Sequence, residues 1–355
     1  MAAVNTDPGR TGEGLYISAL AAQRAGRFAD AVQLLGQASR SGHVGAMTLL
    51  GGQLLFGRGA APDPQEGLSL IVRAAELGGG SACNMAATLS ASGAVGPQDW
   101  ARALDYLQRG AAAGYPAAQE QLKLLADPSG KSTVRLSWAQ MRRRVSLEAW
   151  GKAPEFRVLS ADPEIKAAEA FTTGAVCDWI IGRARDRLQP ASVIANQGEG
   201  QDVRAGVRTN SYAGFDLITT DVVLLLMRER LAAVAGVDIL AMEAPQALHY
   251  SPGEQYRPHF DFMDPQLSGH VEALARLGQR SLTLLVYLND AYEGGETDFP
   301  RLGLKYRGPT GGLLMFRNAD AAGKPDRRML HAGLAPTSGE KWLLSQWIRD
   351  RLARP

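Results

Sequence analysis

Cysteine and histidine are both scarce in this chain of 355 residues, which contains two cysteines and five histidines. Cys83 and Cys177 are far apart in the sequence, so they predict neither a disulfide framework nor a zinc site. Their scarcity fits a reducing compartment, and we expect a cytoplasmic protein. Because no His-x-His pair occurs, the sequence disfavours a cupin-type site that holds its metal through three histidines.

Long apolar segments and net charge are also lacking. No apolar stretch is long enough to cross a bilayer, and residues 1–8 lack the charged flank and apolar core of a secretory signal. The chain has 38 Lys and Arg against 36 Asp and Glu, which leaves a net charge of +2. We therefore expect no nucleic-acid partner and no membrane partner.

The N-terminal third repeats itself with a period of 36 residues. Small residues at fixed positions let helices approach closely, and larger apolar residues supply a buried stripe, so each unit is predicted to be a helix-turn-helix. Residues 11–126 thus predict an α-solenoid, and they resemble the Sel-like repeats, relatives of the tetratricopeptide class. Four columns keep the period: Gly42, Gly78 and Gly114; Ala46, Ala82 and Ala118; Leu35, Ile71 and Leu107; Ala31, Gly67 and Ala103.

Two roles remain open for this array. Repeat arrays usually present a concave surface to another protein, so the array could recruit a protein or peptide substrate. Alternatively, it could serve only in packing or self-association, since nothing in the repeated columns names a ligand. His43 is expected to be a surface or capping residue.

The helical pattern stops at about residue 127, where proline, serine and glycine gather. Residues 127–155 are predicted to be a linker helix, and residues 156–355 a second domain. In that domain a β-type run at 156–159 precedes helices at about 163–188 and 221–234.

From residue 247 onward the pattern is β-type. We expect about seven or eight short antiparallel strands, which predict a jelly roll, or double-stranded β-helix, with flanking helices. The whole chain is thus expected to be an α+β multidomain protein. The clearest strands are Leu282–Leu288, Thr297–Phe299, Gly312–Phe316, Met329–Gly333 and Lys341–Ile348.

The main chemical signal is the pair His259 and Asp261. Side chains alternate along a strand, so these two lie on one face and could hold one ion. His331 is the candidate third donor, although a lone histidine is more often a core residue. Two histidines and one carboxylate on one face of a metal are typical of non-haem Fe(II) oxygenases.

Lys341 follows His331 by ten residues. If both side chains point into the barrel, the buried ammonium requires an anion, and a dicarboxylate would supply one. Hydroxyls of Thr297, Ser345 or Tyr250 could add hydrogen bonds. The alternative is that Lys341 begins an edge strand and faces water. Alternation places one set of side chains on the same face of the last strand: Lys341, Leu343, Ser345 and Trp347.

Residues from about 156 to the end resemble the catalytic domain of the prolyl 4-hydroxylase family of Fe(II)- and 2-oxoglutarate-dependent dioxygenases. The run from Tyr250 to Asp261 matches the family segment Tyr-x-x-Gly-x-x-Tyr-x-x-His-x-Asp. Further matching blocks follow in order: Arg280–Asn289, Gly294–Pro300, His331 with Gly333, and Gly339–Trp342 followed by Trp347. Arg208-Thr209 also falls where the family has an Arg-Thr or Arg-Ser pair.

The resemblance implies a role for each matching residue. His259, Asp261 and His331 would bind iron, and Lys341 would pair with the distal carboxylate of 2-oxoglutarate. The hydroxyl-bearing residues implied as secondary contacts to the co-substrate or the iron region are Tyr250, Tyr287, Thr297 and Ser345. Trp347 and Arg208 would lie on the substrate side. We expect His249 to be structural, because it has the opposite parity to Tyr250.

The implied reaction is hydroxylation of a prolyl residue, in a peptide or as free proline. Fe(II) would be the cofactor, with ascorbate as a further cofactor, and 2-oxoglutarate and O2 would be the co-substrates, with release of succinate and CO2. Two alternatives stay open: the same chemistry on another amino-acid side chain, and a non-catalytic interaction protein built on the repeats. The segment 264–279, which contains His270, is expected to be a loop without an assigned role.

Overall fold

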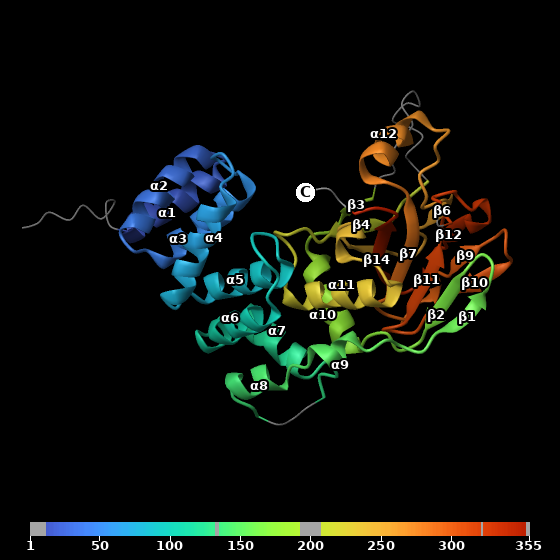
Figure 1. Ribbon diagram of the computed structural model, residues 1–355, viewed down its shortest axis with the longest axis horizontal. Coiled ribbons are helices and arrows are strands. Elements are labelled where there is room, and N and C mark those ends of the chain that lie inside the picture. Colours follow the sequence, from blue (N-terminus) through green and yellow to red (C-terminus); the bar gives the residue numbers. More distant parts are fainter. Residues whose placement is uncertain (1–11, 132–134, 192–206, 321, 353–355) are drawn as a thin grey trace, which may run out of the picture. The chain divides into compact units, whose positions relative to one another are not determined.

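The computed structural model describes residues 12–131, 135–191, 207–320 and 322–352 (Figure 1). The chain forms two compact units. The first contains the residues up to Asp127 together with 131–146 and 221–225, and the second contains 128–130, 147–220 and 226–355. No helix within the described ranges combines the length and the apolar character needed to span a bilayer.

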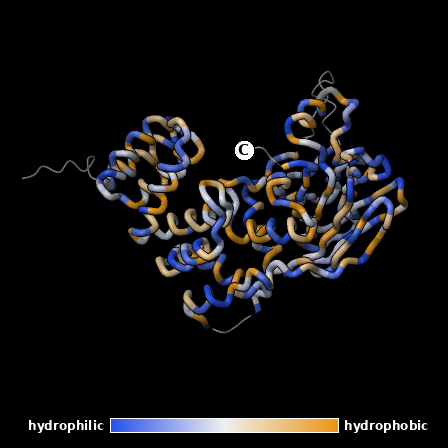
Figure 2. Tube along the Cα trace, in the orientation of Figure 1, coloured by the Kyte–Doolittle hydropathy of each residue, from blue (hydrophilic) through white to orange (hydrophobic). Residues whose placement is uncertain are grey.

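The first unit is an array of antiparallel helices, as the repeat period predicts. Consecutive helices pack against each other, and hydrophobic and hydrophilic segments alternate along them (Figure 2). Its helices are α1 (Gly12–Arg24), α2 (Phe28–Arg40), α3 (Val44–Phe56), α4 (Pro64–Glu76), α5 (Gly80–Ser92), α6 (Trp100–Ala112) and α7 (Pro116–Ala126).

The repeated columns have a direct packing explanation. Leu35, Ile71 and Leu107 are fully buried and supply the apolar stripe. At Gly67 the helices α3 and α4 are so close that an added Cβ would lie 2.8 Å from the carbonyl oxygen of Gly51. The glycine column at 42, 78 and 114 has φ values of 87°, 85° and 81°, a left-handed conformation that favours glycine.

His43 caps α3, as expected. Its Nδ1 accepts a hydrogen bond from the backbone N–H of Ala46, and its Nε2 lies 2.8 Å from Glu13 Oε2. The predicted linker contains two short helices, α8 (Trp138–Arg144) and α9 (Leu147–Gly151), rather than one continuous helix. Ser137 begins α8 with a capping box that it shares with Gln140.

The second unit is built around two facing antiparallel sheets, in agreement with the predicted jelly roll. The large sheet has the strand order β1-β2-β11-β7-β14-β5-β4-β3, the smaller sheet the order β10-β9-β12-β6, and β13 pairs with β8. The strands are β1 (Arg157–Ser160), β2 (Ile165–Ala168), β3 (Gln189–Pro190), β4 (Ser211–Gly214), β5 (Gln246–Tyr250), β6 (Tyr256–His259), β7 (Arg280–Tyr287), β8 (Glu293–Gly294), β9 (Thr297–Phe299), β10 (Leu304–Tyr306), β11 (Leu313–Arg317), β12 (His331–Gly333), β13 (Pro336–Ser338) and β14 (Lys341–Arg349).

The core of this unit lies between the two sheets. Buried side chains from the large sheet, including Leu285, Phe316 and Leu343, pack with Phe299 of the smaller sheet. Helix α10 (Gly174–Arg185) packs on β4 and β5. The remaining helices that the structure describes here are α11 (Val222–Ala235), α12 (Ser268–Leu277) and two short 3-10 helices, η3 (Ile239–Ala241) and η4 (Arg327–Met329).

Three further expectations about local structure were wrong. The first part of the helix predicted at 163–188 is strand β2, because Ile165 and Ala167 enter the core and β2 pairs with β11. The segment 264–279 contains helix α12 and is not a loop. Among the described residues from 246 onward there are ten strands, β5 to β14, more than expected, since strands of two or three residues such as β8 and β13 depend on partners distant in sequence.

Candidate metal centre

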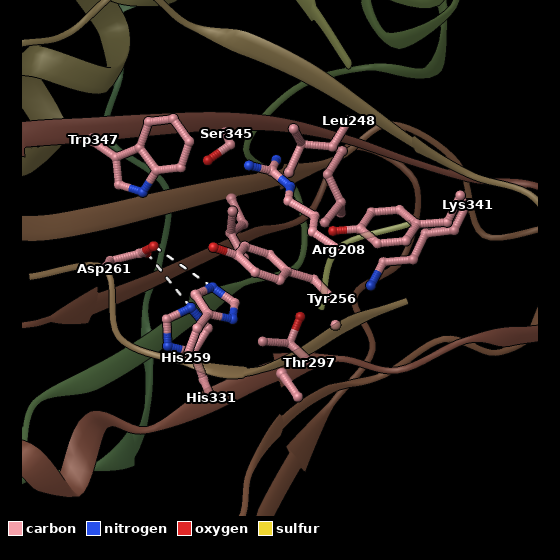
Figure 3. A pocket seen from close by; sticks show the side chains of 15 residues that line it. Arg208, Leu248, Tyr256, His259, Asp261, Thr297, His331, Lys341, Ser345 and Trp347 are labelled. Atoms are coloured by element: carbon pink, nitrogen blue, oxygen red, sulfur yellow. Dashed lines mark ion pairs between the residues drawn. The ribbon is translucent and has the colours of Figure 1, made fainter. Parts of the chain in front are cut away.

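His259, Asp261 and His331 converge at the pocket between the two sheets (Figure 3). Strand β6 ends at His259, and β12 begins at His331 directly opposite it. His259 Nε2 lies 3.7 Å from Asp261 Oδ1, and His331 Nε2 lies 3.5 Å from Asp261 Oδ2. Across the described part of the chain, this is the one group of at least three His, Cys, Asp or Glu that could hold a metal ion.

Backbone carbonyls fix the orientation of both imidazoles. His259 Nδ1 lies 2.8 Å from the carbonyl oxygen of Arg257, and His331 Nδ1 lies 3.0 Å from that of Met329. A carbonyl can only accept, so each Nδ1 carries a proton and each Nε2 is the ring nitrogen that faces Asp261. Two imidazole nitrogens and a carboxylate thus face one point, a donor set that fits a divalent ion such as Fe(II).

The electrostatics favour the protonation states that a metal requires. Burial, reinforced by the neighbouring His331, lowers the pKa of His259 to about 3. Burial alone would raise the pKa of Asp261, but His331, His259, Arg280 and the Thr283 hydroxyl outweigh it and hold that pKa below its ordinary value. At neutral pH His259 is therefore neutral and Asp261 is ionised.

Lys341 brings a buried cation into the same pocket. Its side chain has no exposed surface, and its Nζ lies 5.0 Å from the centroid of the Tyr250 ring. No hydrogen-bond partner for Nζ is found among the described residues, and burial lowers the pKa of Lys341 to about 7. Because β14 lies between β5 and β7, Lys341 does not begin an edge strand and does not face water. The buried ammonium therefore needs an anion.

The pocket brings together all of the predicted site residues except Tyr287. Its predicted members are Arg208, Tyr250, His259, Asp261, Thr297, His331, Lys341, Ser345 and Trp347. Tyr287 lies behind the pocket wall, where its hydroxyl is 2.9 Å from Thr297 Oγ1 and donates to the carbonyl of Tyr306. Its hydrogen bond to Thr297 links it to the pocket, and it packs in the same core cluster as the pocket residues Tyr250 and Leu343.

Tyr256 is a pocket residue for which the sequence predicted no role, although it belongs to the family segment that ends at Asp261. Its ring stacks on His259 with centroids 3.4 Å apart, and the guanidinium of Arg208 lies 4.6 Å from the Tyr256 centroid. Burial raises the pKa of Tyr256 to about 12, so this hydroxyl stays protonated. The pocket also has apolar lining residues that carry no chemical signal in the sequence: Leu248, Leu285 and Leu343.

The other two histidines of the second unit are structural. His249 packs on Trp342 with ring centroids 4.5 Å apart and lies 3.5 Å from Glu340, as its parity predicted. His270 accepts a hydrogen bond from the backbone N–H of Asp264 and so stabilises the turn before α12.

Comparison with known proteins finds a family model that matches part of the second unit, and relatives that match part of the chain. The model of the 2OG-Fe(II) oxygenase superfamily matches residues 245–349. A probable prolyl 4-hydroxylase 9 from Arabidopsis thaliana is 31% identical over 58% of this chain and 74% of its own length.

Solved structures are also similar to parts of the chain. A viral collagen prolyl hydroxylase from Paramecium Bursaria Chlorella virus-1, in complex with 2OG, is 27% identical, with a TM-score of 0.39, over 52% of this chain and 94% of that one. A Sel1 repeat protein from Oxalobacter formigenes is 17% identical, with a TM-score of 0.32, over 42% of this chain and 65% of that one.

Proposed function

Because this chain belongs to the prolyl 4-hydroxylase family of 2OG-Fe(II) oxygenases, we propose that it hydroxylates a prolyl residue, with a peptide as the first candidate substrate. In the balanced reaction, one atom of O2 enters the substrate C–H bond as a hydroxyl. The other enters succinate, which forms from 2-oxoglutarate with loss of CO2.

We assign His259, Asp261 and His331 as the residues that hold Fe(II). The proposal is supported by the backbone contacts at each Nδ1, which leave both Nε2 atoms for a metal, and by the lowered pKa of Asp261, which favours its carboxylate form. When bound, Fe(II) supplies the centre at which 2-oxoglutarate and O2 meet and at which the substrate is oxidised. The three donor atoms lie within 4.8 Å of one another, which is close enough for them to share one ion.

Lys341 is assigned to the distal carboxylate of 2-oxoglutarate. Its buried ammonium lacks a hydrogen-bond partner among the residues described, so an incoming carboxylate would satisfy it by a charge-assisted hydrogen bond. Thr297 and Tyr250 line the pocket near this lysine, and Ser345 follows on the same face of β14. These hydroxyls would orient the bound dicarboxylate, and Tyr287 would orient the Thr297 hydroxyl in turn.

Arg208 and Trp347 are assigned to the substrate side. Arg208 lies over Tyr256, which lies over His259, so these residues form a continuous wall beside the metal-binding atoms. Such a wall would position the target C–H bond and exclude water from the reaction. Trp347 stacks against Arg280, whose charge is balanced by two hydrogen bonds to Glu243.

We also propose a role for the helical array, a cellular location and a further bound molecule. The helical array would recruit a protein or peptide substrate, as repeat arrays commonly do. A cytoplasmic location is supported by two buried cysteines that form no disulfide. The chain would also bind ascorbate, which the resemblance to the family implies.

The observation that carries the proposal is a metal-type donor triad sharing one pocket with a buried lysine that has no hydrogen-bond partner among the described residues. Purified protein should be loaded anaerobically with Fe(II), given ascorbate and 2-oxoglutarate, and offered proline-rich, lysine-containing and asparagine-containing peptides. We expect succinate formation and a gain of one oxygen on proline. Oxygen on another residue would favour the alternative side-chain substrate, and no succinate under any condition would contradict the enzymatic assignment.

A further inference from the structure

Asp261 is held by a hydrogen-bond chain that approaches from outside the pocket. Thr283 on β7 donates through its hydroxyl to Asp261 Oδ2 at 2.7 Å. Asn318, the residue after β11, donates through Nδ2 to Thr283 Oγ1, also at 2.7 Å. The chain therefore links a residue of the metal centre to a side chain that does not line the pocket.

The direction of this chain follows from the chemistry of its members. An ionised carboxylate can only accept, so the Thr283 proton must point at Asp261. The Thr283 oxygen can then only accept from its other neighbour, which requires that Asn318 present its amide nitrogen. Each group thus has one possible role, and the chain has a single arrangement.

Asn318 is held firmly in place, and the burial of its amide costs free energy. Its side chain is fully buried, its backbone N–H donates to the carbonyl of Ser281, and its backbone carbonyl accepts from the N–H of Asp326. Its side-chain Oδ1 is buried without a partner among the described residues. A buried amide whose oxygen accepts no hydrogen bond from the described residues needs an explanation, and the hydrogen bond from its nitrogen to Thr283 supplies one.

We infer that Thr283 and Asn318 are positioning residues for the metal centre. They engage Oδ2 of Asp261 and keep the carboxylate from turning, so that Oδ1 stays on the side of His259. The backbone carbonyls that orient His259 and His331 do the same for the imidazoles. This inference rests on the proposed function, since it assumes that Asp261 binds the metal.

The test uses full-length protein and Co(II) alone, so that its result does not depend on turnover. Thr283→Val removes the hydroxyl at nearly constant volume and should weaken Co(II) binding about 10- to 100-fold, as loss of a partner that orients a ligand does. Thr283→Ser restores the hydroxyl and should bind within about twofold of the wild type. Ser281→Ala is the matched control, because Ser281 lies on the same strand and donates to the carbonyl of Ile348.

Asn318→Leu should also weaken Co(II) binding. In the double variant with Thr283→Val, however, Asn318→Leu should cause no further loss of Co(II) affinity, because Asn318 acts through Thr283. The electronic spectrum of the Co(II)-saturated protein should change in Thr283→Val and be restored in Thr283→Ser. Should Thr283→Val fail to fold, Asn318→Leu, which keeps the Thr283 hydroxyl, decides the same question.

Wild-type affinity and spectrum in Thr283→Val, alongside lost binding in Asp261→Ala, would overturn the positioning role and leave the proposed function intact. Normal Co(II) binding in Asp261→Ala would overturn both.

Discussion

His331 lies directly opposite His259 in the antiparallel pair of β12 and β6, with the two imidazole centroids 4.3 Å apart. The two residues are far apart in sequence, and only the pairing of the two strands brings their rings together. Asp261 then completes the group from just beyond the end of β6. Five experiments can test this arrangement, the residues around it and, separately, the helical array.

Loss of either ligand from the β6 segment should abolish turnover. His259→Ala and Asp261→Ala each remove one of three donors, so we expect 2-oxoglutarate consumption to fall by more than about 100-fold, together with loss of metal binding. Succinate formation without peptide measures this directly. His270→Ala is the matched control, because His270 is in the same unit, is not among the proposed ligands and has its ring bound to the backbone N–H of Asp264. Equal activity in all variants would rule out the assigned ligands.

Lys341→Ala should impair co-substrate binding and spare the metal. A hydrogen bond to a charged group contributes about 1.5–3 kcal/mol, so the KM for 2-oxoglutarate should rise about 10- to 150-fold. Co(II) affinity should stay unchanged. The control is Lys305→Ala, since Lys305 is exposed on β10. An unchanged KM would show that the lysine does not bind the carboxylate.

The same lysine should make stability depend on pH when metal and co-substrate are absent. Burial lowers the pKa of Lys341 from 10.5 to about 7, so between these values the unfolded chain binds more protons than the folded protein. The free energy of unfolding should therefore rise with pH across this range, by at most about 1.4 kcal/mol per pH unit from this group. Urea unfolding of the wild type and of Lys341→Met at several pH values measures the difference. Parallel curves for the two proteins would contradict the prediction.

Tyr287→Phe should weaken the binding of 2-oxoglutarate and slightly destabilise the fold. The change removes the hydroxyl that lies 2.9 Å from Thr297 Oγ1, so the Thr297 hydroxyl loses a partner and becomes less well oriented. We expect a KM increase of a few fold and a loss of about 1 kcal/mol in stability. Tyr306→Phe is the comparison, because among the described residues its buried hydroxyl has no hydrogen-bond partner. The same KM change in both variants would argue against a role for Thr297.

Gly67→Ala should destabilise the helical array without changing the metal centre. The added Cβ would lie 2.8 Å from the backbone oxygen of Gly51, which forces α3 and α4 apart at a cost of about 1–3 kcal/mol. Gly96→Ala is the control, because among the described residues nothing lies within 4 Å of the point that its added Cβ would occupy. Thermal unfolding measures stability, and Co(II) titration should show the same affinity in both variants. Tolerance of alanine at Gly67 would contradict the close packing.

The sequence by itself determined much of the architecture. The period of the columns at Gly42 and Leu35 predicts the helical array, because each repeat must bury the same stripe against its neighbour. The alternation from Lys341 to Trp347 predicts which side chains share a face, because strand geometry allows no other arrangement. Local patterns could not predict β2 or α12, since pairing with β11 and packing within the domain decide whether short ambiguous segments become strand or helix.

Only the tertiary structure decided what these residues do together. In the folded protein β14 lies between β5 and β7, so Lys341 is buried rather than exposed. Tyr287 does not line the pocket, and its hydroxyl contacts that of Thr297 instead. The tertiary structure also joins Asn318 to Asp261 through Thr283. The physical reason is that strand order and register fix contacts between residues distant in the chain, and no periodicity in a single sequence encodes that pairing.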